Sequence, residues 1–387
     1  MNRQKTINTK EKKLYYVENL RILLSALVVI VHVSCTYGGP GGWSYMEKGA
    51  GIATILPLTI LNATSQSFFM GMFFFFGAYF TQKSLARKGY LRFTKDRVIR
   101  LGIPLALTYF FISVFTVYLS WPVKHPEHAD MSFSELLTSG WANGFGVTWF
   151  VLALGYFTAV FLLVSIFCPS VKSKSQKSLP EFSIVHIILG AVIIGVITFL
   201  VRIKYPLFKG SGMSWFPFDL GHFPQYIFLF ALGIAAARYD SDEFISYSEA
   251  RILKWFVVFM ILVVFPLLFF LGNAHSNGIK AFAGRGNWHS LAYAVWEQVT
   301  GFSIIVALLG ITKLKWNKQS KLSALLSKSS FAVYVLHPPI LVGLSMLFIN
   351  WEVMLLIKFL SLTPLALLLS FLAGITVKHI PVLKRIF

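Results

Sequence analysis

The chain has 387 residues, of which 56% are apolar and only 13% are charged, and its formal net charge is +20. An average soluble domain carries charges on about a quarter of its residues, so this composition excludes a disordered chain, a collagen or a coiled coil and argues strongly against a soluble enzyme. In a soluble protein the positive charge would suggest nucleic acid. Cytoplasmic loops of membrane proteins, however, collect Lys and Arg, and we expect no nucleic-acid partner here.

Apolar runs of about twenty residues, the length that spans a bilayer, recur from one end of the chain to the other. They predict an all-α fold, because a backbone in lipid must satisfy its own hydrogen bonds. We expect a polytopic bundle of about ten transmembrane helices forming one domain, 1–387, with a basic leader at 1–17, the bundle at 18–376 and a short tail at 377–387. The predicted spans are 18–37, 58–80, 98–120, 147–168, 182–201, 217–238, 253–272, 291–312, 329–349 and 353–376.

The distribution of basic residues predicts the orientation of the bundle. Most of the 35 Lys and Arg residues fall in segments that share one side when the N-terminus is placed in the cytoplasm. This bias favours both termini in the cytoplasm, and it makes the first span an uncleaved signal anchor. The main exceptions are Arg202, Lys204 and Lys209, which fall on the outer side.

The first span carries two polar side chains, Arg21 and His32, that are costly inside a membrane and therefore indicate function. Eleven helical positions separate them, which amounts to three turns plus about 20°, so both face the same direction at an axial separation of about 16 Å. Arg21 lies near the cytoplasmic boundary, where it could simply snorkel to lipid phosphates. His32 lies deep in the span, and its imidazole can take a proton from a hydroxyl near neutral pH.

Glu297 enters the eighth span from outside to about the depth of His32. A carboxylate there could orient the His32 imidazole, or it could pair with some other cation. His337 lies near mid-membrane in the ninth span and precedes two prolines, which break the helical hydrogen-bond ladder and are tolerated where helices line a cavity.

Three further residues, Gln66, Trp149 and His222, lie where they could reach an outer cavity. For Trp149 the alternative is a residue of the interfacial aromatic belt. We expect no metal site, because the two cysteines are too few for a zinc site and the His125–Asp130 segment reads as a solvated loop.

The densest basic patch precedes the third span. Orientation and attraction to anionic lipid explain part of it, but its density exceeds what orientation needs. Arg97 and Arg100 are three apart and share a face, and paired guanidinium groups suit phosphate recognition. We therefore predict a phosphate-ligand site that includes Arg92, Arg97 and Arg100. The patch consists of Lys83, Arg87, Lys88, Arg92, Lys95, Arg97 and Arg100.

These residues belong to an ordered series of motifs that resembles the acyltransferase-3 family of integral membrane acyltransferases. The Arg–ten residues–His spacing and the Arg–two–Arg pair are the most specific parts of the series. The sequence of the third span and the ending IPVLKRIF are most similar to the branch that contains the glucan succinyltransferases of bacterial envelopes (glucans biosynthesis protein C). The motifs are NLRILLSALVVIVH at 19–32, FFMGMFFFFGAYF at 68–80, KDRVIRLGIPL at 95–105, TWFVLALGYF at 148–157, FPQYIFLFALGIAAAR at 223–238 and SSFAVYVLHPPILV at 329–342.

The resemblance implies a multi-pass enzyme of the bacterial cytoplasmic membrane that moves an acyl group, acetyl or succinyl, from cytoplasmic acyl-CoA to a hydroxyl of an envelope polysaccharide or lipid-linked sugar. By resemblance, His32 matches the essential histidine, Arg21 its partner, and Arg97 and Arg100 the pair that engages the donor. It further implies acyl-CoA as co-substrate, with no permanently bound cofactor.

Three alternatives stay open at the level of the sequence. His32 either activates the acceptor hydroxyl for direct attack or first accepts the acyl group itself. Because no hydrolase-like domain is expected beyond the bundle, the acceptor either reaches the membrane site or receives the acyl group from a separate extracytoplasmic partner protein. A buried His and Glu among ten spans also suit a transporter or flippase for a lipid-linked glycan.

Overall fold

The computed structural model describes residues 14–171, 182–213, 216–239, 246–381 and 383. Ten helical segments among them are long and apolar enough to cross a membrane, which confirms the predicted all-α bundle and its number of spans. Most of the basic leader and of loop 169–181, together with residues 382 and 384–387 of the tail, lies outside the described residues. Each predicted span overlaps one observed segment, although several helices extend well past the predicted ends.

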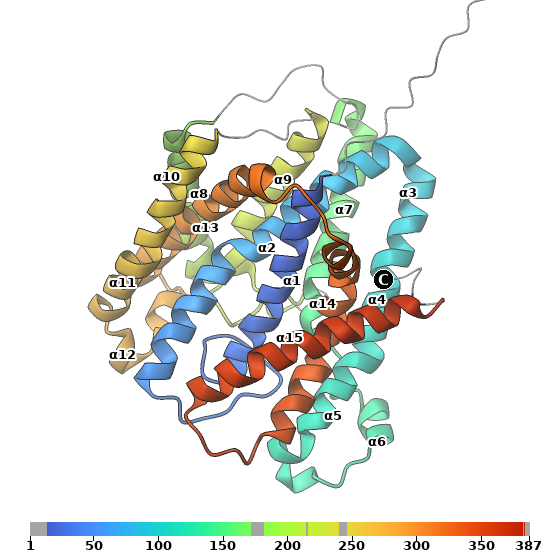
Figure 1. The fold of residues 1–387 in the computed structure, drawn as a ribbon, viewed down its shortest axis with the longest axis vertical. Helices are drawn as coiled ribbons and strands as arrows, with labels where there is room; N and C mark the ends of the chain where they lie inside the picture. The colour runs from blue at the N-terminus through green and yellow to red at the C-terminus, as the bar shows by residue number, and fades with distance from the viewer. Residues whose placement is uncertain (1–13, 172–181, 214–215, 240–245, 382, 384–387) are drawn as a thin grey trace, which may run out of the picture.

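The bundle is built in chain order from helices joined by connections of very different length, from the single residue Gly89 to the segment 125–145 (Figure 1). The third span is assembled from α3 (Tyr90–Arg97), α4 (Ile103–Leu107) and α5 (Ser113–Lys124), and the seventh from α10 (Tyr247–Phe259) and α11 (Phe265–Leu271). The short helices α6 (Phe133–Ser139) and α12 (Ala274–Asn277) lie between spans. The remaining spans are α1 (Tyr15–Thr36), α2 (Ile52–Lys88), α7 (Trp149–Phe167), α8 (Ile184–Lys204), α9 (Phe223–Arg238), α13 (Trp288–Lys315), α14 (Lys321–Leu347) and α15 (Leu355–His379).

Burial divides the spans into an inner and an outer set. At least half of the apolar window is buried in α1, α2, α9, α13 and α14, and at most a third is buried in the others. The outer helices expose large apolar side chains such as Phe111, Phe167 and Leu262, as expected for surfaces that face lipid. In Figure 1, α10 and α11 lie at one edge of the bundle and α3 to α5 at the opposite edge, with α1 between them.

Two glycines let the inner helices approach α2 closely. A Cβ added at Gly301 of α13 would lie 1.9 Å from the carbonyl oxygen of Ser67, and one at Gly233 of α9 would lie 2.3 Å from the carbonyl oxygen of Phe75. Small residues at such crossings allow backbones in membranes to pack tightly. The close contacts fix α2 between α9 and α13, and α2 supplies one wall of the candidate site.

The third span contains two π-type turns, at Val98–Gly102 and Thr108–Ile112. Such turns widen a helix locally and are frequent at functional sites. The first of them contains Arg100 and follows Arg97 directly, so the widened turn lies within the basic motif. It thereby places an irregular backbone where the sequence predicts phosphate binding.

Candidate active site

Two histidines from distant parts of the chain meet at the centre of the candidate site. His32 Nδ1 on α1 lies 2.9 Å from His337 Nε2 on α14, and the two rings are stacked with centroids 5.0 Å apart. His337 is fully buried, whereas His32 is only partly buried and lines a cavity. The sequence predicted both residues as functional, but it did not predict that they pair.

The prolines after His337 determine which nitrogen of each ring carries the proton. α14 runs unbroken through Pro338 and Pro339. A helical residue 338 would normally donate its N–H to the carbonyl oxygen of Tyr334, but proline has no N–H. His337 Nδ1 lies 2.8 Å from that oxygen and donates to it instead.

The position of the proton on His337 also determines the tautomer of His32. With its proton on Nδ1, neutral His337 has an acceptor at Nε2, so the hydrogen bond between the rings is donated by His32 Nδ1–H. His32 Nε2 is then left with a free lone pair, which is the form that a general base requires.

An aromatic strap covers one face of His32. Trp43, in the connection 37–51 between α1 and α2, stacks on His32 with centroids 4.1 Å apart and an interplanar angle of 22°. Asn62 of α2 fixes the strap by donating to the carbonyl oxygen of Pro40 at 2.8 Å. Lys358 of α15 donates to both carboxylate oxygens of Glu47 at 2.9 Å.

The π-face of Trp43 favours a cation beside it, so the strap is placed to stabilise an imidazolium at His32. Burial raises the pKa of Tyr37, the first residue of the strap, to about 12.

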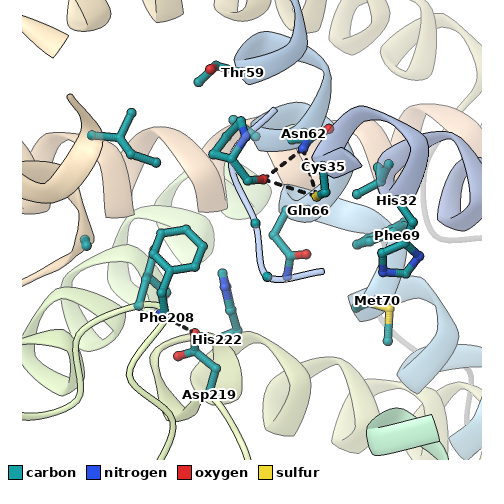
Figure 2. Close-up of a pocket in the computed structure, with 18 of the residues that line it drawn as sticks. His32, Cys35, Thr59, Asn62, Gln66, Phe69, Met70, Phe208, Asp219 and His222 are labelled. Carbon is teal, nitrogen blue, oxygen red and sulfur yellow. Dashed lines mark hydrogen bonds between the residues drawn. The ribbon is translucent and has the colours of Figure 1, made fainter. Parts of the chain in front are cut away.

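We refer to the space in front of His32 as the histidine cavity; it has a volume of about 430 Å³. Figure 2 shows His32, Gln66 and His222 around it, and Trp149 also belongs to its wall. These placements agree with the outer cavity that the sequence predicted for Gln66, Trp149 and His222. His337 does not line the cavity, so its place is behind His32 rather than in contact with a substrate.

Glu297 pairs with Arg202 rather than with His32. Its Oε2 lies 2.5 Å from Arg202 Nη2, and its Oε1 lies 3.3 Å from His222 Nδ1. The structure thus replaces the prediction that Glu297 orients His32 with the alternative that it pairs with another cation. The pair also explains Arg202 as an exception to the charge bias, because this arginine is fully buried and balances a carboxylate.

A second space, the basic cavity, lies toward the N-terminal end of α1 and has a volume of about 840 Å³. Of the three arginines predicted to bind phosphate, Arg97 and Arg100 line it, while Arg92 is exposed on α3 and does not. Arg21 also lines this cavity, a neighbour that the sequence did not predict for the arginine pair. Arg97 is held by a 2.8 Å hydrogen bond to Thr81 Oγ1. The other basic side chains in its wall are Lys83, Arg87, Lys88 and Lys378.

Tyr334 is the one described residue that lines both cavities. Its ring is buried, and its hydroxyl donates to the carbonyl oxygen of Val147 at the start of the fourth span. The same residue supplies the carbonyl oxygen that His337 uses. Tyr334 therefore forms the partition between the cavities and also fixes the histidine pair.

The sequence did not single out Trp43 and Tyr334. Tyr334 lies within a quoted motif, three residues before His337, and this spacing on one helix face could have drawn attention to it. Trp43 follows a Gly/Pro-rich turn, and no periodicity connects it to His32. Within the described ranges, no group of three or more His, Cys, Asp or Glu side chains is placed to hold a metal ion.

A helical bundle with ten candidate spans, a buried histidine pair and a basic cavity defines a multi-pass membrane protein with an enzyme-like site. The acyltransferase domain of the acyltransferase-3 family matches residues 14–375. The chain therefore belongs to this family and is a membrane acyltransferase, which decides against the transporter alternative. No curated protein and no solved structure shows significant similarity to the chain.

Proposed function

We propose that the protein is a membrane-bound O-acyltransferase that moves an acyl group from acyl-CoA to a hydroxyl of an envelope polysaccharide or lipid-linked sugar. In this proposal the CoA phosphates bind the basic cavity, and the acceptor occupies the histidine cavity. Family membership supports the transfer of an acyl group, and the two cavities support the assignment of donor and acceptor sides.

One observation carries the proposal, namely the order of side chains along a single face of α1. Arg21 and Ser25 line the basic cavity, whereas Val28 and His32 line the histidine cavity. A donor anchored by its phosphates near Arg21 can extend the slender pantetheine arm along this face for about 16 Å. Its thioester then reaches His32 once the Tyr334 ring moves aside.

The free lone pair on His32 Nε2 gives a balanced route for transfer. His32 removes the proton of the acceptor hydroxyl while that oxygen attacks the thioester carbonyl. The carbon–sulfur bond then breaks, and the imidazolium returns the proton to the CoA thiolate. In the second route His32 Nε2 attacks the thioester carbonyl, and the carbon–sulfur bond breaks to release the CoA thiolate. The acceptor hydroxyl then attacks the acyl group on His32, the bond between Nε2 and the acyl carbon breaks, and the hydroxyl proton neutralises the thiolate.

The finer assignments also belong to the proposal. The likeness of the third span and the C-terminus to the glucan succinyltransferase branch supports a succinyl donor beside acetyl. The charge bias supports a placement of both termini in the cytoplasm. The resemblance to the family supports a bacterial cytoplasmic membrane, acyl-CoA as a co-substrate rather than a bound cofactor, and an acceptor reached directly or through an extracytoplasmic partner protein.

The test is to incubate membranes containing the protein with acetyl-CoA or succinyl-CoA, labelled in the acyl group, and glycan from the envelope of the producing cells. We expect His32→Ala to lower the label in glycan by about 10²–10⁴-fold, the usual contribution of a general base. His186→Ala is the control, because His186 is exposed on α8 and lines neither cavity.

Equal label in glycan from wild type and His32→Ala would contradict the assignment of His32. An absence of label from the wild type with either donor would contradict the proposed reaction. Label that persists on the wild-type protein without acceptor, and is missing from His32→Ala, would select the covalent route.

A further inference from the structure

The histidine cavity contains a second imidazole that the proposed transfer step does not use. His222 precedes α9 in the short turn Leu220–His222 and projects into the cavity from a different element than His32 (Figure 2). Its side chain is only 14% exposed. The proposed transfer step thus leaves this nearly buried imidazole without a role.

A buried ion pair holds His222 from behind. The side chains of Arg202 and Glu297 are 0% and 1% exposed. Arg202 Nε donates to the carbonyl oxygen of Gly221 at 3.1 Å, and Gln298 Nε2 donates to Glu297 Oε2 at 3.2 Å. Burying two charges is costly unless they are paired and hydrogen-bonded, so this cluster is a built feature with a fixed geometry.

The ion pair also determines the tautomer of His222. Arg202 Nη2 lies 3.2 Å from His222 Nδ1, and a guanidinium can only donate. Glu297 Oε1 lies 3.3 Å from the same nitrogen, but only the Arg202 contact has hydrogen-bond geometry, and Glu297 Oε1 has no hydrogen-bond partner among the described residues. His222 Nδ1 is therefore the acceptor for Arg202, and the proton of the neutral ring lies on Nε2. The carboxylate of Glu297 balances the charge of Arg202, so the ring does not need to be protonated.

The two imidazoles of the cavity thus have opposite hydrogen-bonding character. His32 presents a lone pair at Nε2, whereas His222 directs Nδ1 at the buried ion pair and leaves Nε2–H as a donor. A sugar offers both matching groups on neighbouring carbons, since one hydroxyl can give up a proton while an adjacent oxygen accepts a hydrogen bond.

We propose that His222 is an acceptor-binding residue whose Nε2–H holds an oxygen of the acceptor sugar next to the hydroxyl that His32 activates. The inference rests on the proposed function and deepens it, because it specifies how the acceptor is bound. Gln66 and Trp149 line the same cavity, and the flat indole provides an apolar surface for the sugar ring. Arg202 and Glu297 position His222 without touching the acceptor.

Two amide substitutions distinguish the role of His222 Nδ1 from that of His222 Nε2. In His222→Gln the terminal amide can extend to the place of Nε2 and donate into the cavity. In His222→Asn the shorter amide can still accept from Arg202, but it has no donor at the Nε2 position. Both variants keep a polar partner near the buried cluster, and their level in the membrane is measured beside activity.

The experiment measures acyl transfer from labelled acyl-CoA to envelope glycan as the glycan concentration is varied. Hydrolysis of acyl-CoA in the absence of glycan is followed in parallel. We expect His222→Asn to raise the apparent KM for glycan about tenfold, which is the loss of about one hydrogen bond in a buried site. His222→Gln should stay within about threefold of wild type, and neither variant should change the hydrolysis rate.

Three other outcomes would each contradict the proposed binding of the acceptor by His222. Equal glycan KM in His222→Asn and wild type would show that no acceptor oxygen binds there. Equal losses in both variants would show that His222 only supports the ion pair. A fall in acceptor-independent hydrolysis would move His222 to the donor carbonyl. In all three cases wild-type transfer persists, whereas failure of the proposed function itself would remove transfer from the wild type.

Discussion

The two cavities at the ends of α1 differ in the charged side chains that line them. The basic cavity gathers seven Lys and Arg side chains against two acids, Glu18 and Asp96. Among the described residues in the wall of the histidine cavity, Asp219 is the one Asp, Glu, Lys or Arg. Its carboxylate accepts backbone N–H groups from Phe208 and Gly221, the first of which is marked in Figure 2.

This difference in charge suits the basic cavity to ligand binding and the histidine cavity to acid–base chemistry. In the proposed function, the excess positive charge at one end of the bundle attracts a polyanionic donor. At the other end, neutral imidazoles with fixed tautomers would act on hydroxyl groups, and the ion pair of Arg202 and Glu297 is buried behind His222.

The largest effect is expected at the buried partner of His32. His337→Leu removes the acceptor for His32 Nδ1–H, so the tautomer with a free Nε2 lone pair is no longer favoured. We expect kcat for transfer to fall about 100-fold, within the usual range for general-base catalysis. The apparent KM for acyl-CoA should stay near wild type. His337→Gln, whose side-chain oxygen can accept from His32, should lose less; equal losses in the two variants would contradict the tautomer assignment.

An effect of comparable size, on the KM for acyl-CoA, is expected in the basic cavity. Arg97→Gln combined with Arg100→Gln removes two donors to the CoA phosphates, and hydrogen bonds to charged groups contribute about 1.5–3 kcal/mol each. We expect the KM for acyl-CoA to rise at least 100-fold and the KM for glycan to stay within about twofold.

Arg92→Gln is the matched control for this double variant, because Arg92 belongs to the same basic segment but lies outside the cavity. It should bind acyl-CoA like the wild type. An unchanged affinity in the double variant, measured with a CoA-binding assay, would remove the basis for a donor site in this cavity.

The smallest effect is expected at the partition. Tyr334→Phe keeps the ring and removes the hydrogen bond to the Val147 carbonyl oxygen, at a cost of about 1 kcal/mol. We expect acyl-CoA hydrolysis without acceptor to rise about fivefold, while transfer to glycan changes little. Tyr109→Phe, which lies on neither cavity wall, should leave hydrolysis unchanged. A Tyr334→Phe enzyme with wild-type hydrolysis would show that the hydroxyl does not hold the partition closed.

Helical periodicity predicted those features that depend on one helix alone. The ten spans follow from the length of apolar runs, and the shared face of Arg21 and His32 follows from a spacing of eleven. The joint position of Arg97 and Arg100 in one cavity follows from a spacing of three. In each case the geometry of a single helix fixes the relation between the side chains.

Relations between helices were not predictable in the same way. The register of α1 against α14 brings His32 to His337, which lies 305 positions further along the chain, and no local spacing encodes that register. Glu297 illustrates the limit, because its partner, Arg202, comes from α8 and no local spacing indicates the pairing. Trp43 reaches His32 through a loop that is held by Asn62 of α2 and Lys358 of α15, and no pattern within the loop encodes those contacts.

The Tyr334 partition has a consequence for the energetics of the whole cell. A passage open to ions along α1 would short-circuit the membrane potential, which is worth about 2.3 kcal/mol per elementary charge at 100 mV. The buried ring of Tyr334, whose hydroxyl donates to the Val147 carbonyl oxygen, lies between the two cavities. In the proposed function this ring would keep such a passage closed, and the acyl group would cross the bilayer as a narrow neutral chain while the membrane keeps its electrical insulation.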